Sequence, residues 1–157
     1  MEWSLRACVP EDEAFLRRVY AASREDEIAL TGWTVQQAEA FLRMQFDAQH
    51  RHFHAHNPAA AFDVIEFDGE PVGRLYVRRE PGRIHIIDIA ILPPWRGRGL
   101  GTALFESLQA EGGRSGALVS IHTEINNRAQ ELYRRLGFRE ISTSGLYRLM
   151  QWQPAAA

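Results

Sequence analysis

Arginine and glycine alternate in one short segment of the chain, Arg96-Gly97-Arg98-Gly99-Leu100-Gly101. The segment follows residues 83–92, whose apolar character is typical of a β-strand, and leucines spaced four apart predict a helix from about Gly99. Glycines let the backbone approach a ligand closely, and the N–H groups at a helix start converge on an anion. Arginine side chains add donors suited to phosphate. We therefore predict a diphosphate-binding turn here.

Two common phosphate-binding motifs do not match this turn. A P-loop needs Lys after its last glycine, and all 18 basic residues of this chain are Arg. The dinucleotide fingerprint G-x-G-x-x-G lacks its third glycine whether it is counted from Gly97 or from Gly99. This spacing disfavours an NAD-binding oxidoreductase. The pattern that matches is R-x-x-G-x-G, with Arg96, Gly99 and Gly101.

That pattern resembles the acyl-CoA-binding motif of the GNAT N-acetyltransferase superfamily. A second segment, residues 126–138, is similar to the other signature of this family, N-x-x-A-x-x-L-Y-x-x-x-G-F. The resemblance implies transfer of an acetyl group from acetyl-CoA to a primary amine, by direct attack in a ternary complex. The first half of the chain carries no signature. The alternative from another class is a non-catalytic acyl-CoA-binding sensor module.

The resemblance also implies roles for single residues in binding acetyl-CoA. Backbone groups of a strand would pair with the pantetheine arm, and the N–H of Ile91 would stabilise the oxyanion. Asn126 would meet the arm, although its residue type also suits a plain helix N-cap. The residues expected to bind the cofactor are Ile89, Ala90, Ile91, Arg96, Gly97, Arg98, Gly99, Leu100, Gly101, Thr102 and Asn126.

Two residues are the candidate catalytic groups. The family uses a Tyr at the position of Tyr133, where a phenol could protonate the departing thiolate; the alternative is an aromatic residue of the core. The acceptor amine needs a base, and the family position for Glu, five residues before Asn126, holds Ile121. Asp88 is the leading base candidate because it lies inside an apolar strand, although it could instead face solvent or an Arg. His122 and Glu124 are further candidates.

The order of predicted elements indicates an α/β fold in a single domain, residues 1–153, with a disordered tail at 154–157. A mixed sheet of about six or seven strands would be flanked by about four helices. The first strand is expected at 4–9, a helix from Pro10, and a second helix from Thr34 with a capping box to Gln37. Strands 62–67 and 72–77 flank Asp68-Gly69, which predicts a hairpin, and the last strand is expected at 144–152.

Composition and charge limit the classes of partner expected for this protein. The 157 residues are 45% hydrophobic with one Cys, no apolar run is long enough to span a bilayer, and no signal peptide is evident, so a cytoplasmic protein without membrane or nucleic-acid partners is expected. Residues 1–70 carry 6 Arg against 13 acids, whereas residues 71–157 carry 12 against 7. The acids Glu25, Asp26 and Glu27 could attract a cationic small-molecule or peptide amine.

Two further patterns concern the protein surface. The histidines at alternate positions from His50 to His56 follow a helical stretch, where only i, i+4 pairs share a face, so we expect a solvated surface and no metal site. The apolar C-terminal strand with Tyr147, Leu149 and Trp152 could support a homodimer.

Overall fold

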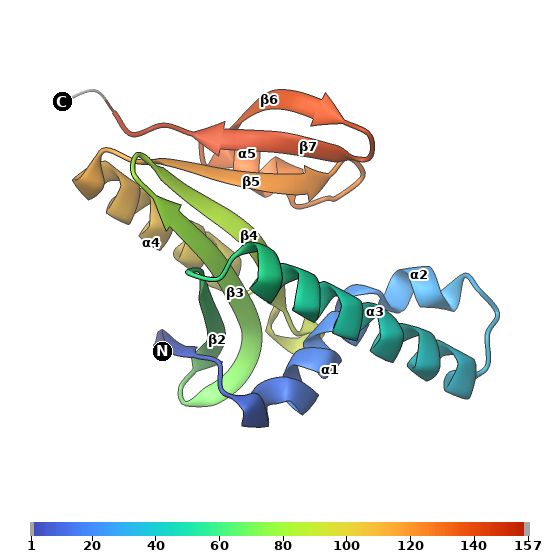
Figure 1. The fold of residues 1–157 in the computed structure, drawn as a ribbon. Helices are drawn as coiled ribbons and strands as arrows, with labels where there is room; N and C mark the ends of the chain where they lie inside the picture. Colours follow the sequence, from blue (N-terminus) through green and yellow to red (C-terminus); the bar gives the residue numbers. More distant parts are fainter. Residues whose placement is uncertain (1, 156–157) are drawn as a thin grey trace. The chain divides into compact units, whose positions relative to one another are not determined.

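The computed structural model describes residues 2–155, which form five α-helices and seven β-strands (Figure 1). The elements are, in chain order, β1 (Trp3–Ala7), α1 (Glu13–Ser23), α2 (Glu25–Ala29), α3 (Val35–His56), β2 (Ala61–Phe67), β3 (Glu70–Glu80), β4 (Arg83–Ile91), α4 (Leu100–Ser115), β5 (Leu118–Glu124), α5 (Gln130–Arg135), β6 (Arg139–Ser144) and β7 (Tyr147–Trp152).

The strands form one mixed sheet in the order β1-β2-β3-β4-β5-β7-β6. The pair β4–β5 is parallel, whereas β1–β2, β5–β7 and β6–β7 are antiparallel. A parallel pair needs a crossover, and α4 supplies it between β4 and β5. The predicted α/β fold with a mixed sheet is confirmed, although the sequence did not predict α2 and β6.

The chain divides into two compact units. One comprises residues 1–75 and 89–96, and the other comprises residues 76–88 and 97–157, so β3 and β4 each contribute to both. The sequence-based expectation of a single domain over residues 1–153 stays a prediction.

The core of the first unit lies where α1 packs on α3. Leu16, Tyr20 and Phe46 are buried there, with Phe15 and Leu42 packed beside them. Leu16 and Tyr20 are four positions apart and therefore lie on the same face of α1. The capping box predicted at the start of α3 is confirmed, because Gln37 N donates to Thr34 Oγ1 over 3.1 Å and Thr34 N donates to Gln37 Oε1 over 3.0 Å.

The core of the second unit gathers around α4. The leucines of α4 predicted to share one face, Leu100, Leu104 and Leu108, are all buried. Phe105 adds an aromatic cluster with Tyr133 and Phe138, at centroid distances of 4.9 and 5.7 Å from Phe105. The helix that carries the predicted diphosphate turn is thus anchored along its length by apolar burial.

Two turns between strands show where the sequence predicted a hairpin and where it did not. Asp68 and Gly69 have φ of 50° and 83° between β2 and β3, which confirms the predicted hairpin. The strand expected at 144–152 is present as β7 but begins at Tyr147, because Gly145, with φ of 60°, lies in the turn of a second hairpin formed by β6 and β7. All six residues of β6 are exposed, so this strand lacks the apolar alternation that predicts strands.

The end of the chain was expected to be a disordered tail at residues 154–157. Pro154 and Ala155 belong to no helix or strand, and residues 156–157 lie outside the described part of the chain.

Candidate active site

The N-terminus of α4 is open to an anion. Gly97 and Gly99 have φ of 72° and 80°, a left-handed conformation that favours glycine, and both are exposed. Gly99 occupies the N-cap position and has no side chain to cap the helix. The N–H of Ala103 donates to the Gly99 carbonyl, so the N–H groups from Leu100 to Thr102 precede the helical hydrogen-bond ladder. These donors, with the positive end of a 16-residue helix, suit a phosphate group.

Within the second unit, which contains β4 only as far as Asp88, β4 and β5 pair in parallel. Their parallel register covers four pairs, from Arg83–Leu118 to Ile86–Ile121. β5 continues to Glu124 and keeps its antiparallel partner β7 up to the pair Glu124–Tyr147. β5 therefore continues for three residues past its last recorded pair with β4.

Tyr133 and Asp88 are brought together in the second unit. Tyr133 on α5 is only 4% exposed and contacts the rings of Phe105 and Phe138. Burial, followed by the negative charge of Asp88, raises the pKa of the Tyr133 phenol to about 12. The phenol therefore stays protonated at neutral pH. A tyrosine packed in the aromatic core can still carry a proton to donate. The interpretation of Tyr133 as a core residue is therefore compatible with its proposed catalytic role.

The loop between β5 and α5 corrects one prediction. Asn126 does not cap α5, because the N-cap residue is Ala129 and the helix begins at Gln130. The side chain of Asn127 turns the loop instead, accepting a hydrogen bond of 2.9 Å from Ala129 N. Asn126 itself is exposed and lies in the turn immediately before Asn127. Its expected contact with the cofactor arm stays a prediction.

Gln130 holds this loop in place, and sequence reasoning did not identify it. Its Nε2 donates to the carbonyls of Glu124 and Ile125 over 2.9 and 2.8 Å, and Arg148 of β7 donates to its Oε1 over 2.6 Å. The side chain is 4% exposed, so these bonds satisfy a buried amide. The only available signal was a Gln within the apolar face of a short helix, which does not reveal its partners.

Four of the predicted cofactor-binding residues belong to the first unit: Ile89, Ala90, Ile91 and Arg96. The Nε of Arg96 donates to the Ile91 carbonyl over 2.8 Å, so this side chain fixes the turn after β4.

Gly73 of β3 is a further residue that the motifs did not identify. A Cβ at this position would collide with the Ala90 carbonyl, so β3 and β4 approach closely only because Gly73 lacks one.

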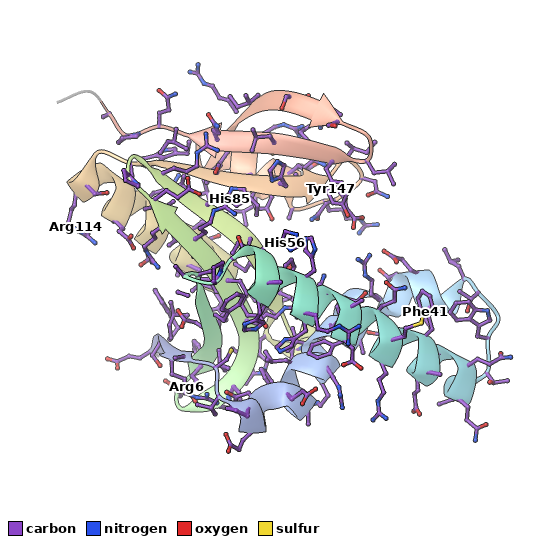
Figure 2. All side chains as sticks on the ribbon, in the orientation of Figure 1. Arg6, Phe41, His56, His85, Arg114 and Tyr147 are labelled. Carbon is purple, nitrogen blue, oxygen red and sulfur yellow. The ribbon has the colours of Figure 1, made fainter. Side chains whose placement is uncertain are left out.

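The remaining candidate bases differ in exposure. His122 is exposed, Glu124 is half-buried, and Ile121 is 4% exposed at the position where the family motif places Glu. The ring of His122 lies 5.2 Å from that of His85, a buried residue marked in Figure 2, whose Nδ1 is 2.7 Å from Ser120 Oγ. Burial, then the charge of Arg78, lowers the pKa of His85 to about 4. His85 is therefore neutral at physiological pH.

The histidines expected to form a solvated surface lie on the last turns of α3. Their rings pair at i, i+4, with centroid distances of 4.4 Å for His50–His54 and 4.0 Å for His52–His56 (the latter residue is marked in Figure 2). Across residues 2–155, no three His, Cys, Asp or Glu side chains come together in a way that could hold a metal ion.

Comparison with known proteins assigns the chain to a family. Residues 15–138 match the family model described as the acetyltransferase (GNAT) family. This protein therefore belongs to the GNAT family.

Relatives and solved structures agree with this assignment. An N-alpha-acetyltransferase of Sulfurisphaera tokodaii is 33% identical over 97 residues, covering 52% of this chain and 58% of the relative. An uncharacterized N-acetyltransferase of Methanocaldococcus jannaschii is 36% identical over 90 residues, covering 50% of this chain and 39% of the relative. The chain thus matches less than two thirds of the length of either relative. The crystal structure of the PaiA N-acetyltransferase from Thermoplasma acidophilum in complex with coenzyme A has a TM-score of 0.72 and 16% identity, covering 98% of this chain and 99% of that one.

The length and apolar character of a helix decide whether it could cross a membrane. Within residues 2–155, no helix combines the length and apolar character that crossing a bilayer requires.

Proposed function

We propose that this chain is an acetyl-CoA-dependent N-acetyltransferase that moves an acetyl group to a primary amine by direct attack in a ternary complex. The observation that carries the proposal is the uncapped N-terminus of α4, with Gly97 and Gly99 in left-handed conformations. Thr34 caps the start of α3, whereas α1, α2, α4 and α5 have no side-chain cap, and among these four only α4 follows two left-handed glycines. A start that leaves its backbone N–H groups exposed suits an anionic ligand such as the pyrophosphate of CoA.

The expected cofactor contacts fit this arrangement. The N–H groups of residues 97–102 would hold the pyrophosphate, with Arg96 and Arg98 nearby in sequence to add positive charge. Backbone groups of Ile89, Ala90 and Ile91 would pair with the pantetheine arm, and Asn126 would contact it.

The proposed chemistry needs a proton donor and a base. Acetyl-CoA supplies a thioester whose sulfur leaves as the amine attacks. The Tyr133 phenol, protonated at neutral pH, would give its proton to that sulfur, and the N–H of Ile91 would stabilise the oxyanion. Asp88, whose charge reaches Tyr133, would take the proton of the attacking amine. No covalent enzyme intermediate is required.

The acceptor is proposed at the level of a primary amine on a small molecule or a peptide. The acids Glu25, Asp26 and Glu27 are exposed and form the first turn of α2. Negative charge at this end of a helix also interacts favourably with the helix dipole. If they bind a cationic acceptor, replacing them with Gln raises the KM for the amine. An unchanged KM excludes that role and leaves them as helix-stabilising residues.

The test of the proposal proceeds in two steps. Thermal unfolding with acetyl-CoA, CoA and NAD is expected to show stabilisation by the first two ligands and none by NAD. Release of free thiol from acetyl-CoA with a panel of amines then separates an enzyme from a non-catalytic acyl-CoA sensor. Binding without thiol release for any amine would favour the sensor, and stabilisation by NAD alone would overturn the proposal.

The cytoplasmic location and the homodimer through the C-terminal strand stay predictions. Tyr147 is 50% exposed, and Leu146 and Ile141 on the same hairpin are 70% and 53% exposed, which supports an apolar contact surface. Sedimentation of the purified chain with and without Ile141→Arg tests the dimer.

A further inference from the structure

Thr123 carries a buried hydroxyl group whose partner is missing among the described residues. The residue is 4% exposed and pairs with Arg148 of β7 through the strand backbone. Buried hydroxyl groups in folded proteins nearly always make a hydrogen bond, because removal from water without one is costly. An orphaned hydroxyl in the interior therefore calls for a partner that binds there.

The position of Thr123 is where the β4–β5 pairing ends. The last recorded pair is Ile86–Ile121, and side chains two residues apart on a strand share a face. Thr123 and Asp88 are therefore the first residues on that face beyond the last pair, one on each strand. The charge of Asp88 also acts on the buried Tyr133 phenol. Thr123 thus shares a face of the sheet with Asp88, one of the two candidate catalytic residues.

The other buried hydroxyl on β5 provides a contrast within the same strand. Ser120 is fully buried, and its Oγ lies 2.7 Å from His85 Nδ1. It lies inside the paired part of β5, opposite His85, and its hydrogen bond is made within the protein. The Ser120 hydroxyl, in the paired region, has a hydrogen-bond partner, whereas the Thr123 hydroxyl, beyond the recorded pairs, has none within the part of the chain that the structure describes.

We infer that the Thr123 hydroxyl donates a hydrogen bond to a carbonyl oxygen of the pantetheine arm of acyl-CoA. This inference rests on the proposed function and adds a side-chain contact to a cofactor site so far built from backbone groups, Arg96, Arg98 and Asn126. The arm offers amide carbonyls along an extended chain, and a Thr hydroxyl can donate to one of them. Thr123 is a binding residue for the cofactor.

The experiment compares wild type with Thr123→Val and Thr123→Ser, measuring thermal unfolding without ligand and CoA affinity by calorimetry. Thr123→Val removes the hydroxyl and keeps the side-chain shape, so the melting temperature of the free protein should be unchanged or higher. The dissociation constant for CoA should rise about fivefold, the contribution of one neutral hydrogen bond. Thr123→Ser restores the hydroxyl and should return the affinity to within about twofold of wild type.

Two control variants calibrate these results. Ser120→Ala removes a satisfied buried hydroxyl and should lower the melting temperature of the free protein. Thr143→Val, on the exposed strand β6, should leave CoA affinity unchanged.

The outcomes separate this inference from the proposed function. If wild type binds CoA and Thr123→Val binds it equally well, the inference is overturned and the proposed function stands. If Thr123→Val lowers the melting temperature of the free protein as Ser120→Ala does, the hydroxyl already has a partner such as a buried water, which also overturns the inference. If wild type binds neither CoA nor acetyl-CoA, both proposals fail together.

Discussion

The helices α3 and α4 begin in opposite ways. α3 starts with a capping box, in which Thr34 and Gln37 satisfy each other's backbone N–H groups. α4 starts at Gly99, after a turn in which Gly97 and Gly99 adopt left-handed conformations. The burial of the two helices is reversed as well, because the 22 residues of α3 bury only Phe46, whereas the 16 residues of α4 bury five.

The two helices are stabilised in different ways, and this difference determines which helix start is free for a function. α3 has little apolar burial, so its end must be stabilised locally by hydrogen bonds. α4 is held by its buried leucines and can leave its N-terminus without a cap. The backbone N–H groups at an uncapped helix start are available to a ligand, so we propose the anion site on α4 rather than on α3.

The largest expected effect concerns the buried tyrosines of the two units. Tyr133→Phe should lower kcat roughly 100-fold, because it removes the proposed proton donor, and should leave the dissociation constant for CoA unchanged. Tyr20→Phe is the matched control, since Tyr20 of the first unit is 5% exposed, and it should leave kcat unchanged. Steady-state kinetics and calorimetry on both variants give the result. An unaltered kcat in Tyr133→Phe would assign the donor to another group.

The second prediction addresses the uncapped end of α4. Gly99→Asp should weaken CoA binding about 30-fold, because two negative charges about 8 Å apart at an effective dielectric of 20 repel by about 2 kcal/mol. Gly116→Asp, at the C-terminal cap of the same helix, introduces the same residue at a φ of 71° with open space around it. It should match Gly99→Asp in backbone strain and leave CoA binding intact. Equal losses of affinity would show that the N-terminus holds no phosphate.

The third prediction concerns buried ionisable groups. His85 has a pKa lowered from 6.5 to about 4, so the unfolded chain takes up a proton before the folded one does as pH falls. Stability is therefore present above pH 6.5 and is lost as pH falls toward about 4, by an amount on the order of 2 kcal/mol. Denaturant unfolding at several pH values should show this loss in wild type and a smaller one in His85→Gln.

The first unit provides the contrast for this pH dependence. The pKa of Asp12 lies below 3.8 because Arg6 donates to both its carboxylate oxygens, over 2.8 and 2.9 Å. Its contribution is therefore lost only as pH falls below 3.8. A loss between pH 6.5 and 4 that is the same in wild type and His85→Gln would assign the transition to another group.

The smallest effect is expected at the cap of α3. Thr34→Ala removes one side-chain acceptor of the capping box and should lower the free energy of unfolding by about 1 kcal/mol. CoA affinity should not change, because this helix start is satisfied internally. Chemical denaturation and calorimetry on the same preparation test both statements, and a loss of CoA binding would contradict the separation between α3 and α4.

Local sequence signals predicted most of the elements. The capping box at Thr34, the hairpin at Asp68-Gly69 and the leucine spacing of α4 each depend on residues within a few positions of one another. β6 was not predicted because all its residues are exposed and its pairing with β7 defines it. Asn126 was expected to cap α5, but the loop continues for three more residues and is fixed by Gln130, which bonds the Glu124 carbonyl and accepts from Arg148 of β7.

The sequence by itself determined the family resemblance, the position of the glycine turn and the identity of Tyr133 as the candidate donor, because these depend on residue type and spacing along the chain. Only the tertiary structure decided that Asp88 acts on Tyr133, that Gln130 holds the β5–α5 loop, and that the buried Thr123 hydroxyl has no partner among residues 2–155. These properties depend on burial and on contacts between strands and helices distant in sequence. Hydrogen bonding and pKa shifts follow from the environment of a side chain, which residue spacing does not specify.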